Sequence, residues 1–389
     1  MCWKCTAASS ACRTSSAAMR CSLSVSHVHA CSIFSMNANR RSAIFISIRA
    51  GSWKGFRTDM IDVKLTTCAP TWPWARQTPG DSLQWGPFRF HVDTEVERCD
   101  AWVVFESLSQ TENTFCPPEN VFFIAGEPDT IGSYQPAFLD QFAHVVSGRN
   151  DLQHRHQIRL QQGHPWFVEK SFDELASMPP IPKSRDISVI SSDKAFTEGH
   201  RARLDFVRAL QQRFGDRVEV WGRGLRDFEQ KWDVLAPYRF AIVLENFAGD
   251  DFLTEKLPDA LLAYCFPIYY GCTNVDRYLP DEASLKIDIE DTEAALDAIG
   301  RLLANPEEYD RRLDGIARAR QYYLHQLQFF ANLAHVLERH VRSDVAAAPV
   351  SLAVNGSFAA APAVTPQPEA PAAPAPVSLM SRLRRLMRG

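Results

Sequence analysis

The sequence lacks an apolar run long enough to cross a membrane. A spanning helix needs about 20 consecutive apolar residues, and the longest early candidate, residues 42–48, is far shorter. A strong net charge is also missing, because the formal value is -4 at pH 7. This balance gives no indication of nucleic-acid binding. With 389 residues and 46% hydrophobic content, the chain is long enough for two globular domains.

Two kinds of cofactor motif are absent or incomplete. No GxGxxG motif follows a predicted strand, so a Rossmann-type dehydrogenase is a weak alternative. Cys2 and Cys5 form a lone CxxC without the second pair of a zinc site. The five cysteines after residue 59 are scattered, which is typical of buried free thiols in a reducing cytoplasm.

Residues 1–59 contain almost no acids. They hold eight Lys or Arg, a single acid (Asp59) and five of the ten cysteines. Three interpretations are open: a targeting segment, a redox or metal module, or sequence upstream of a native start at Met60. We favour the last, because the alternating pattern of a first strand begins directly after Met60. Residues 1–59 are therefore predicted to be a non-native or disordered extension.

Residues 60–180 are predicted to form a first domain. Proline and glycine clusters separate short apolar strands, and one short helix is expected near residues 136–141. The predicted strands are residues 61–66, 88–92, 101–106, 120–125 and 143–148. Residues 154–186 have no regular pattern and end in a proline-rich stretch, which disfavours helix and central strand. We place the domain boundary at residue 180.

Residues 181–342 show a regular alternation of strands and helices. The predicted strands are 187–191, 218–222, 239–245, 266–270 and 285–289, and the helices are 200–214, 255–264 and 291–304. This alternation predicts a parallel sheet with helices on both faces. A last helical stretch, 306–342, is expected to pack across both domains. The predicted fold class is α/β, with two Rossmann-like domains facing a cleft.

The end of the chain differs in composition from both domains. Residues 343–376 are rich in Ala and Pro and are predicted to be a disordered linker. In residues 377–389, Leu379, Leu383 and Leu386 fall on one helical face among several arginines. A solvated tail and a weak anchor to anionic lipid both agree with this pattern.

Residues 245–256 connect an apolar strand to a helix in the second domain. Ligands of parallel sheets bind beyond the carboxyl ends of the strands. Thr254 is a plausible N-cap, and the free N–H groups of the following turn favour an anion. Lys256 adds a positive charge for phosphate, and the Glu255 carboxylate can accept hydrogen bonds from ribose hydroxyls. The pattern agrees with a nucleotide-sugar site, and also with an ordinary solvated helix start.

The stretch RFAIVLENFAGDDFLTEKLPDALLAYCFPIYYG, residues 239–271, resembles the donor-binding signature of glycosyltransferase family 10, the inverting α-1,3/1,4-fucosyltransferases. Members of this family share a Glu-Asn pair, an aromatic-x-Thr-Glu-Lys box and a Pro-(Val/Ile)-Tyr-(Tyr/Trp)-Gly ending. A fainter resemblance extends over residues 119–340. It implies a fold of the GT-B type, in which residues 60–180 bind the acceptor and 181–342 bind the nucleotide sugar.

Carried over residue by residue, the resemblance implies that Glu255 contacts the ribose and Lys256 the diphosphate. Arg203 matches a phosphate-binding arginine, with Arg201 as the alternative. The implied donor-binding set is Arg203, Glu245, Asn246, Phe252, Glu255 and Lys256. Cationic side chains of this kind would stabilise the leaving diphosphate.

The stretch FFIAGEPDT, residues 122–130, resembles the family's strand that carries the presumed general base. That base would be Glu127, and Asp129 is the residue most easily confused with it. An inverting transfer needs one carboxylate to take the proton of the acceptor hydroxyl. The resemblance therefore implies that Glu127 is catalytic.

One departure qualifies the resemblance, and one acidic motif raises a separate question. Phe252 stands where the family usually has Tyr, so a hydroxyl is missing and the identity of the sugar is left open. The acidic triplet 93–95 superficially resembles a metal motif of the other large glycosyltransferase fold, but chance is the better explanation. We expect no metal ion and no cofactor other than GDP-fucose as the donor substrate.

The predicted function is inverting transfer of fucose from GDP-fucose to a hydroxyl of a glycan, in surface polysaccharide or lipopolysaccharide assembly. A bacterial cytoplasmic enzyme is expected, with a peripheral contact of residues 377–389 to the inner face of the membrane. The expected partners are a nucleotide-sugar donor and a glycan acceptor, and no nucleic acid. Two alternatives are a transferase for another nucleotide sugar and a non-catalytic protein that binds nucleotide sugars or glycans.

Overall fold

The computed structural model of the chain describes residues 60–191 and 198–358. The predicted extension 1–59, the tail 377–389 and the part of the predicted linker after residue 358 lie outside the described residues. Residues 192–197, which precede the first long helix of the second domain, also lie outside them.

The first sheet has seven strands in the order β2-β3-β1-β4-β6-β7-β8. In chain order these are β1 (Ile61–Thr67), β2 (Gln84–Trp85), β3 (Phe88–Val92), β4 (Ala101–Phe105), β6 (Val121–Ile124), β7 (His144–Val146) and β8 (Gln157–Ile158). Only the edge strand β2 runs antiparallel to its neighbour among the pairs of this sheet. All residues of β4 and β6 are buried, because side chains cover both faces of a central parallel strand.

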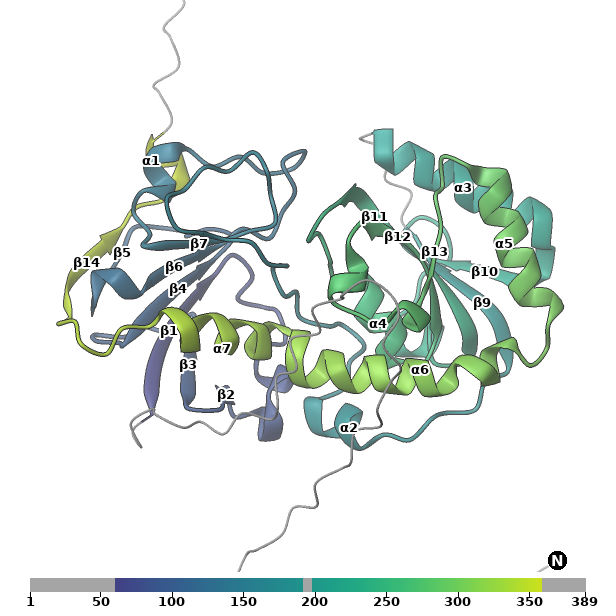
Figure 1. Ribbon diagram of the computed structural model, residues 1–389, viewed down its shortest axis with the longest axis horizontal. Helices are drawn as coiled ribbons and strands as arrows, with labels where there is room; N and C mark the ends of the chain where they lie inside the picture. Colours follow the sequence, from purple (N-terminus) through teal and green to yellow (C-terminus); the bar gives the residue numbers. More distant parts are fainter. Residues whose placement is uncertain (1–59, 192–197, 359–389) are drawn as a thin grey trace, which may run out of the picture. The chain divides into compact units, whose positions relative to one another are not determined.

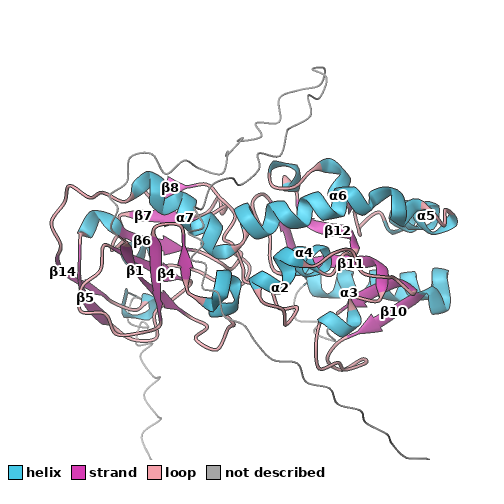
Figure 2. Ribbon diagram, turned by 90° about the horizontal axis from the view of Figure 1, so that it is seen from below, coloured by secondary structure: helices cyan, strands magenta, loops and turns pink. Residues whose placement is uncertain are grey.

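The second sheet has five parallel strands in the order β10-β9-β11-β12-β13. They are β9 (Arg185–Ile190), β10 (Val218–Trp221), β11 (Tyr238–Gly249), β12 (Phe266–Cys272) and β13 (Leu285–Lys286). Helices whose buried residues join its core include α3 (Glu198–Phe214), α4 (Lys256–Leu262), α5 (Thr292–Ala304) and α6 (Glu308–Tyr322). Figures 1 and 2 show these helices around the strands.

The predicted fold class is confirmed, since two Rossmann-like parallel sheets with flanking helices, the GT-B type, make up the described chain. The long strands and helices also agree with the sequence patterns, because buried parallel strands give apolar runs that are easy to recognise. No helix within residues 60–191 and 198–358 has both the length and the apolar character needed to span a membrane.

The predicted helix 306–342 is interrupted. A π-helical turn, Tyr323–Leu327, follows α6, and the extended residue Gln328 then starts α7 (Phe329–His340) by accepting a hydrogen bond from the Phe330 amide at 2.9 Å. The apolar face of α7 packs in the core of the first sheet, whereas α6 belongs to the core of the second. Figure 1 shows α7 lying against β1 and β3. The expectation that this stretch packs across both domains is confirmed.

The two cores do not follow the sequence boundaries at 180 and 342. Residues Trp166, Phe172 and Leu175, assigned by sequence to the first domain, pack in the core of the second sheet. Helix α7, assigned to the second domain, packs in the core of the first. The chain thus crosses between the cores twice, and a boundary based on local composition does not detect such crossings.

The linker predicted for 343–376 is wrong at its beginning. Strand β14 (Ala348–Leu352) pairs antiparallel with β5 (Glu112–Cys116), and the side chain of Leu352 is buried. Ala348, Val350 and Leu352 alternate with more exposed residues, as in a half-buried strand. The Ala/Pro-rich composition hid this period of two.

The segment 154–186 was also predicted to be irregular, but it contains helix α2 (Phe172–Ser177). Ser171 and Glu174 form a capping box, in which each side chain accepts a hydrogen bond from the other residue's backbone amide. Helix α1 (Pro136–Leu139) lies where one short helix was expected.

Candidate active site

An acid, a hydroxyl and a lysine form a buried cluster where β11 connects to α4. The Glu245 carboxylate accepts hydrogen bonds from the Thr254 hydroxyl at 2.7 Å and from the Lys256 ammonium group at 2.9 Å. It also accepts one from the Thr254 amide at 3.1 Å. Glu245 is almost completely buried, so this cluster fixes the position of Lys256.

Thr254 is not the N-cap that the sequence predicted. The residue before α4 is Glu255, which has helical backbone angles and makes no side-chain cap. The Thr254 hydroxyl donates to Glu245, and its oxygen accepts a long hydrogen bond from the Lys256 amide at 3.5 Å. A buried carboxylate needs several donors, and the Thr254 hydroxyl supplies one of them to Glu245. The Glu245 contact could not be recognised from the loop sequence alone.

Glu255 lies between two cations. Its carboxylate is 3.7 Å from the Lys256 nitrogen and 3.8 Å from the Lys231 nitrogen. His164 Nδ1 is 3.6 Å away. Burial opposes the negative charge, but Lys256 and the other neighbours outweigh burial and hold the pKa of Glu255 well below its usual range. Glu255 is therefore ionised at neutral pH and can accept hydrogen bonds.

The alternation of charges continues toward Asp259. The Lys231 ammonium group contacts the Asp259 carboxylate at 2.7 Å, and the Phe167 amide donates to the same carboxylate at 2.8 Å. Burial raises the pKa of Asp259 to about 6, although Lys231 opposes this shift. Lys231 and Asp259 were not recognised from the sequence; the signal for Asp259 is its position four residues after Glu255 on the same helix.

Lys256 and Arg203 supply positive charge to the same place from different elements. Burial disfavours the charge of Lys256, but Glu245 and Glu255 raise its pKa. Arg203, on α3, is buried within electrostatic range of Glu245 and Lys256; burial lowers its pKa and Glu245 opposes this shift. Arg201 is exposed, whereas Arg203 is buried and interacts electrostatically with Glu245 and Lys256.

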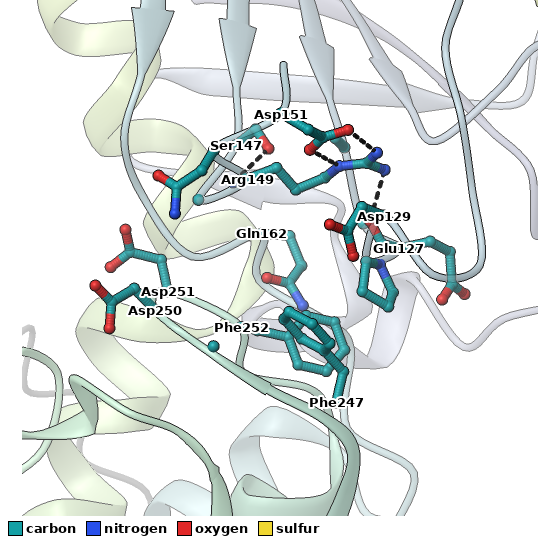
Figure 3. Close-up of a pocket in the computed structure, with 16 residues that line it drawn as sticks. Glu127, Asp129, Ser147, Arg149, Asp151, Gln162, Phe247, Asp250, Asp251 and Phe252 are labelled. Atoms are coloured by element: carbon teal, nitrogen blue, oxygen red, sulfur yellow. Dashed lines mark hydrogen bonds and ion pairs between the residues drawn. The ribbon is translucent and has the colours of Figure 1, made fainter. Parts of the chain in front are cut away.

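A small pocket lies beside this cluster. Its volume is about 100 Å³, and it is lined by the loops after β6 and β7 and by the loop between β11 and α4 (Figure 3). The lining includes Glu127, Asp129, Gln162, Phe247 and Phe252. The first and second sheets thus both contribute side chains to one site.

Phe252 lines this pocket, whereas the predicted donor residue Asn246 is not among its lining residues. Phe252 is buried and meets Phe247 edge to face, with ring centroids 5.5 Å apart and planes at 89°. Asn246 is half-buried within β11. The close approach of the two loops requires Gly148, because a Cβ atom there would lie 2.4 Å from the Cβ of Asp251.

Glu127 follows β6 and is half-buried in the pocket wall. Burial raises its pKa, and the nearby carboxylate of Glu106 raises it further, whereas His164 and Lys256 act in the opposite direction. A carboxylate with a raised pKa holds a proton more readily at neutral pH than an exposed one. Asp129 also lines the pocket but is exposed.

Two residues that the sequence did not suggest hold the loop of Glu127. The Glu106 carboxylate accepts hydrogen bonds from the amides of Gly126 at 2.5 Å and Glu127 at 3.0 Å, and from the Tyr134 hydroxyl at 2.5 Å. Arg149 donates to the carbonyls of Glu127 at 3.1 Å and Gly132 at 2.8 Å.

Arg149 itself is fixed by a bidentate pair with Asp151, at 2.9 and 2.6 Å, and its guanidinium group lies over the Tyr134 ring. A recognisable signal existed: Glu106 and Arg149 follow β4 and β7, the two strands beside β6. Polar residues at these carboxyl ends meet at one edge of the sheet.

The acidic triplet 93–95 lies elsewhere. The Asp93 carboxylate accepts hydrogen bonds from the Thr67 amide at 2.6 Å and the Thr67 hydroxyl at 2.7 Å. This contact gives Asp93 a structural role at the ends of β1 and β3.

Comparison with known proteins shows which family part of the chain resembles. Residues 182–330 match the model described as glycosyltransferase family 10 (fucosyltransferase), C-terminal part. Residues 182–330 therefore form a region similar to the C-terminal domain of family 10 fucosyltransferases. The matched range of this domain contains Arg203, Glu245, Glu255 and Lys256, and the predicted resemblance is confirmed; the bacterial origin stays a prediction.

Two curated relatives match parts of the chain. GDP-fucose protein O-fucosyltransferase 3 of Danio rerio is 40% identical over 58 residues, which are 15% of this chain and 13% of that protein. The 4-galactosyl-N-acetylglucosaminide 3-alpha-L-fucosyltransferase of Pongo pygmaeus is 29% identical over 115 residues, 28% of this chain and 32% of that protein. The chain therefore spans about a third or less of the length of these relatives.

Crystal structures of an alpha1,3-fucosyltransferase are also similar. The structure with GDP has 18% sequence identity and a TM-score of 0.47, and the match covers 77% of this chain and 95% of that chain. The structure with GDP-fucose has 17% identity and a TM-score of 0.44, with 75% and 93% covered.

Proposed function

We propose that the protein transfers fucose from GDP-fucose to a hydroxyl group of a glycan acceptor, with inversion at the anomeric carbon. The observation that carries this proposal is the convergence of Arg203, Glu255 and Lys256 where β11 connects to α4, inside the family 10 fucosyltransferase domain. A relative that matches part of the chain is named as a GDP-fucose protein O-fucosyltransferase.

In this proposal Lys256 and Arg203 bind the diphosphate. Lys256 donates to Glu245 at 2.9 Å, and this contact orients its ammonium group. Positive charge fixed in place is effective when charge develops on the leaving diphosphate. Glu255, ionised and partly exposed, accepts hydrogen bonds from the ribose hydroxyls.

Glu127 is the proposed general base. It lines the pocket beside Phe252, and its raised pKa suits a group that must take a proton near neutral pH. As the acceptor oxygen attacks the anomeric carbon of the donor, the bond from that carbon to the diphosphate breaks. Glu127 takes the proton of the acceptor hydroxyl in the same step.

One observation favours a second candidate, transfer from another nucleotide sugar. Phe252 places an apolar ring in the pocket wall, and Phe247 packs against it, so this side presents no hydroxyl to a sugar. A different pattern of sugar hydroxyls would then be selected. A protein that binds nucleotide sugars without catalysis would have the same donor cluster but would not depend on Glu127 for a reaction.

Calorimetric titration of the full chain with GDP, GDP-fucose, GDP-mannose and UDP-glucose tests the proposal. GDP and GDP-fucose should bind, and GDP-fucose should bind more tightly than GDP-mannose. Preferential binding of GDP-mannose or UDP-glucose would favour the second candidate. If none of the four ligands binds, the proposed function is wrong.

We further propose that the enzyme acts in the cytoplasm on surface glycans and that residues 377–389 contact anionic lipid there. The support is the pattern of leucines and arginines in that segment. Deletion of residues 377–389 should reduce co-sedimentation with vesicles containing anionic lipid. Unchanged co-sedimentation would contradict the lipid contact and leave the transferase proposal intact.

A further inference from the structure

Two adjacent glutamines after β8 differ in how their side chains are used. Gln161 and Gln162 are both buried, with 1% and 5% of their surfaces exposed. A buried amide side chain is expected to have hydrogen-bond partners, because loss of hydration is otherwise uncompensated. The two residues therefore provide a direct comparison within one short segment.

Gln161 has a complete set of partners within the protein. Its Nε2 donates to the Leu327 carbonyl at 2.9 Å, and its Oε1 accepts from the Gly163 amide at 2.6 Å. The Asn332 amide group donates to the Gln161 carbonyl at 3.0 Å. These bonds join the segment to the start of α7, so the role of Gln161 is structural.

The side-chain amide nitrogen of Gln162, Nε2, is buried and lacks a hydrogen-bond partner among the described residues. The residue lines the pocket that contains Glu127 and Phe252. Figure 3 shows its amide end turned toward the rings of Phe252 and Phe247. An unpaired donor in a pocket wall is a group that a ligand can satisfy.

The other pocket walls indicate what kind of ligand fits. Glu127, Asp129 and Asp250 offer carboxylate oxygens, which accept hydrogen bonds from hydroxyl groups. Phe247 and Phe252 offer apolar ring surface. A sugar has hydroxyl donors for the carboxylates, an apolar C–H surface for the rings, and oxygens that can accept from Gln162.

We infer that Gln162 binds the sugar that is transferred, by donating a hydrogen bond from Nε2 to one of its oxygens. This inference rests on the proposed function and extends it to sugar recognition. The donor sugar is preferred over the acceptor because the pocket wall formed by residues 247–252 leads directly into the loop of Glu255 and Lys256. A sugar attached to a diphosphate at Lys256 therefore lies next to this wall.

Substitution Gln162→Met tests the inference, because Met keeps a similar length and removes the donor. GDP affinity should stay unchanged, since GDP lacks the sugar. GDP-fucose affinity, measured by calorimetry, should fall about 3- to 10-fold, as expected for one lost hydrogen bond. Thermal stability should stay the same or rise, because an unpaired buried donor has been removed.

Gln161→Met is the matched control. It removes hydrogen bonds made within the protein, so it should lower the melting temperature, and it should not weaken GDP-fucose binding more than GDP binding. Gln162→Leu serves as a second variant and should repeat the effect of Gln162→Met on GDP-fucose.

Three results would overturn the inference. If Gln162→Met binds GDP-fucose as the unsubstituted protein does, Gln162 does not contact the donor sugar. If it weakens GDP and GDP-fucose equally and lowers the melting temperature as Gln161→Met does, its role is structural. If the unsubstituted protein binds neither GDP nor GDP-fucose, the proposed function itself fails, and the inference about Gln162 fails with it.

Discussion

The two sides of the site are built in different ways. On the second sheet, Glu245, Glu255 and Lys256 come from one short stretch between β11 and α4. On the first sheet, Glu106 and Arg149 are 43 positions apart and meet Glu127 only because β4, β6 and β7 are neighbours. The contiguous motif was recognised from the sequence. The arrangement made by strand order was missed, although polar residues after neighbouring strands were a signal for it.

The two sides also differ in how the surroundings shift the pKa of their ionisable groups. The pKa of Lys256 is raised and that of Glu255 is lowered, so both groups keep their charges across the neutral range. Burial and Glu106 raise the pKa of Glu127 instead, which brings its proton equilibrium closer to neutral pH. This difference supports the proposal that the second sheet binds a charged group and the first carries out proton transfer.

Glu127→Gln is the strongest test of this division. Turnover with GDP-fucose should fall by about 10²- to 10⁴-fold, because the general base is lost. Calorimetric affinity for GDP-fucose should change little, since the proposed nucleotide site lies on the second sheet. Asp129→Asn is the matched control and should have a small effect. Equal losses in the two variants, or an unchanged rate in Glu127→Gln, would contradict the assigned role.

Lys256→Ala tests the second sheet. GDP affinity should fall about 100-fold, as for the loss of one buried charged partner. Stability should fall by about 3 kcal/mol, because Glu245 is left buried without its cation. Chemical denaturation and calorimetry measure the two effects. The double variant Glu245→Gln, Lys256→Met should recover stability but not GDP binding; recovery of both would show that Lys256 does not bind the nucleotide.

Glu106→Gln separates charge from geometry on the first sheet. Gln keeps an acceptor for the amides of Gly126 and Glu127 but removes the negative charge that raises the pKa of Glu127. The acidic limb of the pH–rate profile should therefore move to lower pH, with a loss of less than about 10-fold at neutral pH. Glu106→Ala removes the acceptor and should lower the rate at every pH. An unshifted limb in Glu106→Gln would show that Glu106 does not act through Glu127.

The two cores should respond differently to acid. Burial, together with His340 and His156, lowers the pKa of His144 in β7 to about 4. Because this lies below the value of about 6.5 in the unfolded chain, stability is lost as pH falls through that window, by about 1 kcal/mol between pH 7 and 5 after allowing for solvent screening.

Asp259 in α4 contributes a pH dependence of stability with the opposite sign. Its pKa, raised to about 6, favours folding as pH falls below that value. Hydrogen exchange should therefore show reduced protection of β7 and α7 at pH 5 and no reduction around α4. His144→Phe should remove the acid sensitivity of β7. Equal losses in both regions would contradict the comparison.

Chelation of metal ions by EDTA should have the smallest effect on turnover. Lys256 and Arg203 already place positive charge near the proposed diphosphate position, so GDP-fucose turnover should be unchanged in EDTA. Complete loss of turnover in EDTA, restored by manganese, would refute this prediction.

The sequence predicted the repeated strand–helix pattern well, because apolar runs and helical periods are local properties. It failed where a local signal was weak or hidden. The alternation in β14 was hidden by Ala and Pro, and the capping box of Ser171 and Glu174 lay in a segment judged irregular from its prolines. The break at Gln328 depends on packing against two different cores.

By itself, the sequence determined an α/β fold, the family 10 motif and the chemical types of the donor residues, since these depend on neighbours in the chain. Only the tertiary structure decided that Glu245 neutralises Lys256, that Glu106 and Arg149 hold the loop of Glu127, and that Gln162 has an unpaired donor. The physical reason is that burial and hydrogen-bond partners are set by strand order and loop packing, which join residues far apart in the sequence.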